Sequence, residues 1–236
     1  MKPSRFSSLL SQCCVLALAA LLLPAAGAAA AADRVVVVPL VDTVKGVPKT
    51  GQTRCYAATW PVAEIPCAGT GQDGELQKGI AWPAPRFTDN MNGTVVDNLT
   101  GLVWLKNADC LNGVRTRDQA LKFANSLYDG YGLPGALLDC GLADGSTAGH
   151  WRLPNRFELE SLLDLGQADP ALPPGHPFVN VRSDWYWTSS YHSYYYNLRV
   201  AWAVHFNSGQ VEGRSWVLED GPEDGRSYVW PVRDGR

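Results

Sequence analysis

The sequence lacks the motifs by which common enzyme classes are recognised. It contains no H-E-x-x-H zinc motif, no G-x-S-x-G nucleophile elbow and no phosphate-binding glycine-rich loop. It also has no C-x-x-C pair, which argues against zinc sites and dithiol redox sites. The sequence therefore predicts no catalytic residue and no metal-binding residue.

Positive charge is scarce. Apart from Lys2 and Arg5, the chain carries 18 basic and 23 acidic residues, a formal charge of −5. It has neither a basic block nor a basic amphipathic segment. Nucleic acids and anionic membranes attract basic surfaces, so we expect neither as a partner.

Strongly hydrophobic runs are confined to the N-terminus. Lys2 and Arg5 precede an apolar run over Cys14–Leu23, and an alanine-rich stretch follows it. This order is typical of a secretory signal peptide, here Met1–Ala32, with cleavage before Asp33. The run is short for a transmembrane helix, and no second apolar span follows. We expect an exported protein, periplasmic or secreted, with no membrane span after signal removal.

Four cysteines lie after the signal: Cys55, Cys67, Cys110 and Cys140. An even number of cysteines in an exported chain predicts two disulfides, with three possible connectivities. We favour Cys55–Cys67 and Cys110–Cys140, because each pair is confined to one segment of the chain. The first pair would hold residues 33–85, a loop-rich segment that is too short and polar to form a good core.

Two groups of acidic residues are candidates for a calcium site. Asp73 and Glu75 lie in the loop-rich segment, although the surrounding sequence lacks the D-x-D-x-D-G pattern. Asp220, Glu223 and Asp224 lie in a Gly/Pro-rich loop near the C-terminus. Solvated turns are the more common use of such residues, so we predict no cofactor.

The best-defined local pattern is the stretch His150–Asp164. A strand that alternates around Arg152 leads to a helix in which Asn155 and Glu158 form a capping box. Three leucines share one face of this helix, and Gly166 can end it in a left-handed cap. The predicted core contains Trp104, Trp151, Leu153, Leu159, Leu162, Leu163 and Trp202.

Further elements are predicted on both sides of this stretch, and the absence of long βαβ alternation argues against a parallel sheet. They are a hairpin with strands Thr94–Asp97 and Leu102–Leu105, a capped helix over Thr116–Tyr128, an aromatic strand over Trp185–Ser190, a second hairpin over Arg199–Trp216 and a closing strand over Ser227–Val232.

Three motifs carry a family resemblance: "WRLPNRFELESLLD", "PALPPGHPF" and "WYWTSS". They resemble the bacterial DUF1566 family, which includes the C-terminal domain of the Legionella collagen-like protein. The resemblance covers about Arg86 to Arg236. It implies an α+β fold similar to a C-type lectin-like domain, with two helices packed on short antiparallel sheets and with the first and last strands paired.

The most suggestive stretch for ligand binding is the loop Tyr191–Arg199. Four tyrosines in six residues are poor core material, because each buried hydroxyl needs a partner. On a loop, tyrosines supply rigid contact area on which sugar C–H faces can stack, although half of them could instead pack the loop against the sheet. The loop Leu218–Ser227 could contribute as well. The predicted ligand-binding residues are Tyr191, His192, Tyr194, Tyr195, Tyr196 and Arg199.

We therefore favour an exported binding module that recognises a glycan or a protein through these loops. The Legionella relative is an adhesin for sulfated glycans, but the acidic balance of this chain does not favour that ligand, because sulfate recognition needs a basic surface. An envelope enzyme, either a hydrolase or a modifying enzyme, would instead gather carboxylates with His192 or His205 in one pocket. A structural envelope domain would have no small ligand.

Overall fold

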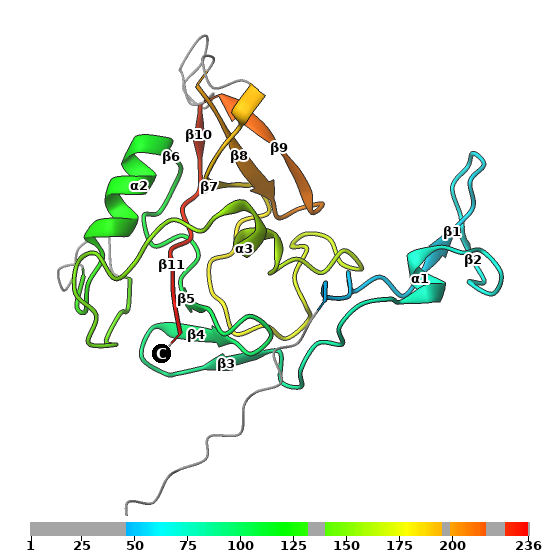
Figure 1. Cartoon of the computed structure of the whole chain (residues 1–236), viewed down its shortest axis with the longest axis horizontal. Coiled ribbons are helices and arrows are strands. Elements are labelled where there is room, and N and C mark those ends of the chain that lie inside the picture. The colour runs from blue at the N-terminus through cyan, green and yellow to red at the C-terminus, as the bar shows by residue number, and fades with distance from the viewer. Residues whose placement is uncertain (1–45, 132–139, 195–198, 216–224, 236) are drawn as a thin grey trace, which may run out of the picture. The chain divides into compact units, whose positions relative to one another are not determined.

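The computed structural model describes residues 46–131, 140–194, 199–215 and 225–235, which lie within one compact unit, Val44–Arg236. The predicted signal peptide, Tyr195, Tyr196, Asp220, Glu223 and Asp224 lie outside the described residues. The elements in chain order are β1 (Cys55–Tyr56), β2 (Glu64–Ile65), α1 (Asp73–Leu76), β3 (Phe87–Asp89), β4 (Thr94–Asp97), β5 (Val103–Leu105), β6 (Arg115–Thr116), α2 (Arg117–Ser126), α3 (Arg156–Glu160), β7 (Trp185–Tyr191), β8 (Val200–His205), β9 (Gln210–Ser215), β10 (Arg226–Ser227) and β11 (Val232–Arg233) (Figure 1).

Four antiparallel strands form the larger sheet, in the order β11-β5-β4-β3. The hairpin β4–β5 is the one that the sequence predicts, with Val95 opposite Trp104. Gly101 adopts the left-handed conformation at its turn, with φ of 74°. The last strand, β11, pairs with β5 and not with β3, the first strand of the predicted domain. The pairing of first and last strands that the resemblance implies is therefore wrong for this sheet.

The second sheet has the antiparallel order β7-β8-β9. Strands β8 and β9 form the second predicted hairpin. Strand β7 extends one residue beyond the predicted end at Ser190, because Tyr191 pairs with Ala201 after a register shift. The loop that we predicted as ligand-binding therefore starts directly at the end of this sheet.

The segment predicted as one closing strand forms two short strands in different sheets, a two-stranded sheet with β6 and the four-stranded sheet. Strand β10 pairs with β6, and β11 pairs with β5. Between them, Tyr228 donates its backbone N–H to Trp185 O (2.8 Å) and accepts one from Trp187 (3.0 Å). Pro231 follows and has no N–H to donate, which prevents one continuous ladder.

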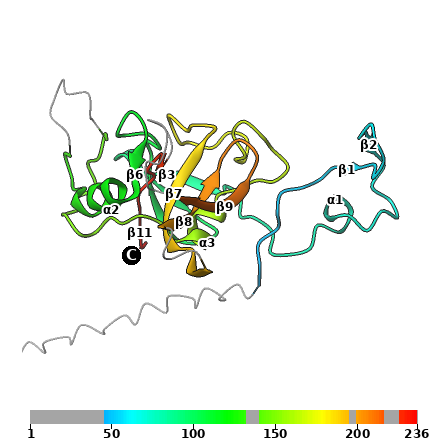
Figure 2. The same cartoon turned by 90° about the horizontal axis from the view of Figure 1, so that it is seen from above.

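Both predicted capping boxes form. Helix α2 begins after Thr116, whose side chain accepts from the backbone N–H of Gln119, and α3 begins after Asn155, whose side chain accepts from that of Glu158. Helix α2 packs against β6 and β7, whereas α3 packs against β7 and β8 (Figure 2). The helices therefore cover the strand that leads into Tyr191.

Helix α3 is shorter than predicted. It ends at Glu160, and Ser161 caps it in the right-handed conformation. Gly166 is not among the residues with positive φ, so the predicted left-handed cap is wrong. Gly166 instead lies against another segment, where an added Cβ would come within 2.6 Å of Gly51 O. Close backbone approach is the reason for glycine at this position.

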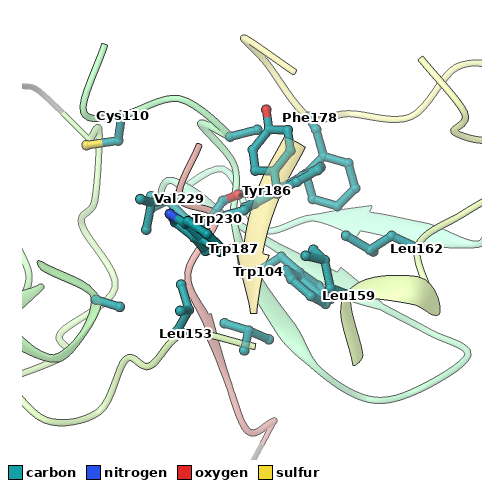
Figure 3. Packing of buried hydrophobic residues seen from close by; sticks show 14 of the residues in the cluster. Trp104, Cys110, Leu153, Leu159, Leu162, Phe178, Tyr186, Trp187, Val229 and Trp230 are labelled. Carbon is teal, nitrogen blue, oxygen red and sulfur yellow. Dashed lines mark hydrogen bonds between the residues drawn. The ribbon is translucent and has the colours of Figure 1, made fainter. Parts of the chain in front are cut away.

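The core is rich in tryptophan (Figure 3). Trp230 packs edge-on against Phe178 and Trp104, with ring centroids 4.8 and 5.9 Å away. Six of the seven predicted core residues are buried: Trp104, Trp151, Leu153, Leu159, Leu162 and Leu163. The seventh prediction, Trp202, is wrong, because this side chain is only partly buried.

Both favoured disulfides form: Cys55 with Cys67, and Cys110 with Cys140. The first joins the chain on either side of the β1–β2 hairpin, and the second links the segment after β5 to the one that precedes His150. The described residues thus form a mixed helix and sheet fold with small antiparallel sheets and two disulfides, in agreement with the predicted α+β class.

Candidate ligand-binding surface

Tyr191 lies at the end of β7, where 54% of the residue is exposed. The guanidinium carbon of Arg117, the first residue of α2, lies 4.2 Å from the centre of its ring. Arg117 also donates a hydrogen bond to Ser189 O at 2.7 Å. Burial lowers the pKa of Arg117, but an arginine remains charged at neutral pH. The charge is thus held against the tyrosine ring, in the geometry of a cation–π contact.

Trp202 on β8 forms the second aromatic contact of this region. His192 stacks on it, with ring centroids 4.4 Å apart and an interplanar angle of 29°. The guanidinium carbon of Arg156 lies 4.1 Å from the Trp202 ring centre. Polar and cationic groups therefore cover a ring that we expected in the core, which explains its partial exposure.

Gly213 makes room for His192. It is the residue opposite Trp202 in the β8–β9 pair. A Cβ at this position would lie 2.8 Å from His192 Cδ2 and 2.7 Å from a methyl carbon of Val200. The absence of a side chain lets the imidazole lie flat against the sheet beside Trp202.

The remaining described residues of the loop are exposed. Tyr194 is 76% exposed, and Arg199 is exposed where the chain returns to β8. Tyr195 and Tyr196 lie outside the described residues. The structure therefore brings Tyr191, His192 and Arg199 to the same end of one sheet, with Tyr194 on the loop between them.

Sequence reasoning missed three residues that support this surface, Arg117, Arg156 and Trp202, of which Arg117 is itself buried. The arginines stand at the first positions of α2 and α3, and each reaches an aromatic ring on another element. No local pattern identifies such a contact, because it depends on how the helices pack on β7 and β8. Trp202 alternates with Val204 and Phe206 like a core residue, and only its neighbours show otherwise.

A surface of this composition can stack its aromatic rings on a ligand and donate hydrogen bonds to the same ligand. Tyrosine and tryptophan faces bind the C–H faces of sugars or apolar groups of a protein. Guanidinium groups add several N–H donors with fixed directions. Nothing in this arrangement requires a metal, and the described residues contain no group of three or more His, Cys, Asp or Glu side chains placed to hold one.

Of the acidic residues considered for calcium, the two in the loop-rich segment have protein partners. Glu75 accepts backbone N–H groups of Gly69 and Gly71 at 2.6 and 2.7 Å, and these hydrogen bonds lower its pKa. Asp73 accepts a hydrogen bond from the Thr50 hydroxyl. Both carboxylates thus fix the turn around α1.

The histidines that an enzyme would need are placed apart. His192 stacks on Trp202, whereas His205 lies 4.0 Å from a single carboxylate, Asp184, and 4.6 Å from the Trp185 ring. His150 is exposed and contacts Thr147.

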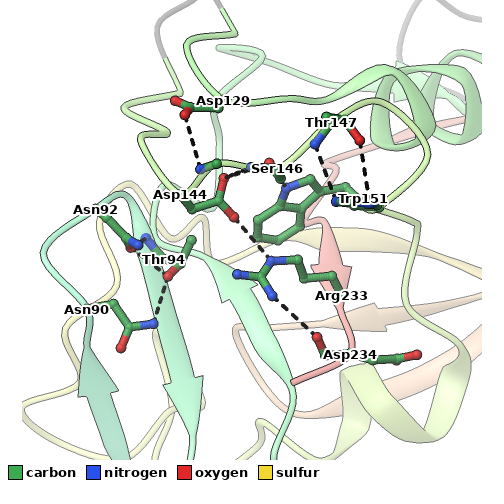
Figure 4. A network of polar contacts seen from close by, with 12 residues as sticks. Asn90, Asn92, Thr94, Asp129, Asp144, Ser146, Thr147, Trp151, Arg233 and Asp234 are labelled. Atoms are coloured by element: carbon green, nitrogen blue, oxygen red, sulfur yellow. Dashed lines mark hydrogen bonds and ion pairs between the residues drawn. The ribbon is translucent and has the colours of Figure 1, made fainter. Parts of the chain in front are cut away.

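A separate polar cleft of about 890 Å³ is lined by residues of β4, β5, the 144–150 segment and the C-terminal residues 233–235 (Figure 4). In its wall, the inaccessible side chain of Asp144 accepts from Arg233 Nε at 3.1 Å and from the Ser146 hydroxyl at 2.6 Å. Trp151 Nε1 donates to the same hydroxyl at 2.9 Å. Ser146 is therefore fully engaged, and the cleft has no serine–histidine pair of the kind that hydrolases use.

Comparison with known proteins gives one result. The model of a family described as the Lcl C-terminal domain matches residues 93–233. No curated protein and no solved structure matches the chain. Among the described residues, no helix is long and apolar enough to cross a membrane.

Proposed function

Because the chain belongs to the Lcl C-terminal domain family, we propose that it is an exported binding module that recognises a glycan or a protein ligand. The ligand contacts the surface that includes Tyr191, His192, Tyr194 and Arg199. The domain is C-type lectin-like, with this loop in the ligand-binding role.

The observation that carries this proposal is the exposure of aromatic rings beside fixed guanidinium groups. Tyr191 and Tyr194 are 54% and 76% exposed, on a sheet end where Arg117 and Arg156 are already held against rings. Large exposed aromatic residues next to arginines are typical of contact surfaces, where such residues supply most of the binding energy. Because the buried Arg117 lies against Tyr191, it holds that ring in place, and less side-chain entropy is lost on binding.

Export is supported by the N-terminal pattern and by the two disulfides. Disulfides persist in oxidising compartments, so Cys55–Cys67 and Cys110–Cys140 suit a periplasmic or secreted protein. The signal peptide over Met1–Ala32 remains a sequence prediction.

The proposal is tested by screening the purified protein against an array of glycans and extracellular matrix proteins. The variant Tyr194→Ala should lose about 1–3 kcal/mol of binding free energy for each hit, the range of aromatic anchors. Tyr56→Ala, which removes an exposed tyrosine from β1, is the matched control and should bind normally. Equal binding by both variants, or no hit at all, would overturn the proposal.

A further inference from the structure

The polar cleft beside β11 is built from distant parts of the chain. Val96 of β4 and Val103 of β5 supply apolar lining, and Asn90, His150 and the C-terminal residues 233–235 supply polar lining. Gly101, Gly145, Gly149 and Gly235 also line the cleft. Gly235 lies against the backbone of Gly101, where an added Cβ would come within 2.1 Å of Gly101 O.

The polar groups of the cleft are fixed before any ligand binds. Asp144 accepts both the backbone N–H and the hydroxyl of Ser146, at 3.1 and 2.6 Å, as well as the N–H of Arg233 Nε. The guanidinium carbon of Arg233 lies 5.4 Å from the centre of the Trp151 ring, which is fully buried. Such a network holds Arg233 in one orientation and reduces the entropy lost on binding.

Several groups in the cleft have hydrogen-bonding capacity left over. Arg233 uses Nε and one terminal nitrogen, and among the described residues none accepts from the other terminal nitrogen, Nη2. Asn90 donates to Thr94 with its amide nitrogen, which leaves the amide oxygen as an acceptor. Figure 4 shows Asn90 and Arg233 on two sides of the network. One donor and one acceptor thus belong to residues that line the same cleft.

The charges of the cleft select against an anion. Arg233 is bonded to Asp144 and lies next to Asp234, whose carboxylate accepts from Arg152 at 2.8 Å. Arg152 also forms an ion pair with Glu158. The hydrogen bond between these two side chains raises the pKa of Arg152. These five residues carry three negative and two positive charges, so an anionic ligand would find no surplus of positive charge.

We propose that this cleft is a second binding site and that it takes a neutral, hydroxyl-rich ligand, namely one or two uncharged sugar units. Adjacent hydroxyls can accept from Arg233 Nη2 and donate to Asn90 Oδ1 or to the exposed Asp234 carboxylate. Val96, which is partly buried, meets the C–H face of the ring. The site shares no residue with the tyrosine surface, and it goes beyond the function proposed above.

The test is a titration of the ¹⁵N-labelled protein with the methyl glycosides of glucose, galactose, mannose and N-acetylglucosamine, followed by NMR. At least one probe should shift the backbone amide signals of residues 144–150 and 233–235, with an affinity of about millimolar. Glucuronate, which has the same ring but carries a carboxylate, should bind at least about threefold more weakly than methyl glucoside.

Variants separate this site from the tyrosine surface. Asn90→Ala should weaken the glycoside about three- to tenfold, as expected for a lost hydrogen bond. His205 lies outside the cleft lining and His205→Ala is the control, so the shifts of residues 144–150 and 233–235 should be unchanged in it. No shift with any of the four glycosides, tighter binding of glucuronate, or shifts confined to Tyr191 and His192 would each overturn the inference.

Discussion

The aromatic rings of the core and those beside the tyrosine loop are held by different partners. In the core, Trp187 and Trp230 each donate a ring N–H to a backbone carbonyl at 2.8 Å, and rings meet other rings edge-on. At the end of β7, Tyr191 and Trp202 lie instead against arginines and a histidine.

The neighbours of an aromatic residue therefore bear on whether it stabilises the core or forms part of the surface. A ring that packs between other rings is removed from water and contributes to stability through buried area. At the end of β7, Tyr191 and Trp202 pack against guanidiniums and stay partly exposed. A guanidinium neighbour does not decide this by itself, because Trp151 lies 5.4 Å from that of Arg233 and is fully buried.

The difference between the core and the end of β7 can be tested by removing one tryptophan from each region. Trp187→Ala should destabilise the fold by about 3–5 kcal/mol, because it leaves a large cavity and removes a satisfied N–H. Trp202→Ala should cost roughly half of that or less, because less of its area is buried. Chemical denaturation of both variants measures the difference. Equal losses would mean that Trp202 is a core residue after all.

A second pair of variants compares two residues near α3. Leu162 is buried, and Leu162→Ala should lower the free energy of unfolding by about 2–5 kcal/mol. Phe157 lies on the helix but is 75% exposed, so Phe157→Ala should cost no more than about 0.5 kcal/mol. A melting temperature that is unchanged by Leu162→Ala would show that the buried face is assigned wrongly.

The two disulfides should differ in their effects. Replacing Cys110 and Cys140 together by Ser should lower stability by about 2–4 kcal/mol, because their bond closes the longer loop, 30 residues against 12. Replacing Cys55 and Cys67 should release mainly residues 55–67 and leave the main unfolding transition nearly unchanged. In this variant, we expect a protease to cleave residues 55–67 while the main unfolding transition stays at its normal position. If the main transition also shifted to lower stability, the prediction would be contradicted.

The smallest expected effect is a pH dependence from His176. Burial lowers the pKa of this histidine below its usual 6.5. The unfolded chain therefore takes up a proton first, so stability that is present above about pH 6.5 decreases as the pH falls through 6.5 toward the folded pKa. Melting temperatures between about pH 7.5 and pH 5 should fall less in His176→Gln than in the parent protein. An identical slope would rule out this histidine as the cause.

The sequence predicts the local features of this fold well. The capping boxes at Thr116 and Asn155 and the hairpins β4–β5 and β8–β9 depend on residues a few positions apart, so their patterns can be read directly. The loop Tyr191–Arg199 was found for the same reason, since a run of tyrosines is itself a local signal.

Features that depend on distant contacts could not be predicted in this way. Gly166 looks like a helix cap, but it is set by the approach of Gly51. Arg117 and Arg156 look like ordinary first-turn residues until their helices pack on β7 and β8. The polar cleft joins Asn90, Asp144 and Arg233, which are separated by more than fifty residues at each step, so no window of sequence contains it.

The central claim, that the tyrosine surface binds ligand without supporting the core, is tested most directly by one paired measurement on Tyr194→Ala. Binding of the best array ligand and the melting temperature are measured on the same sample. We expect a loss of roughly tenfold or more in affinity with a melting temperature close to that of the parent protein. Loss of both together would show that Tyr194 is a packing residue and would contradict the account.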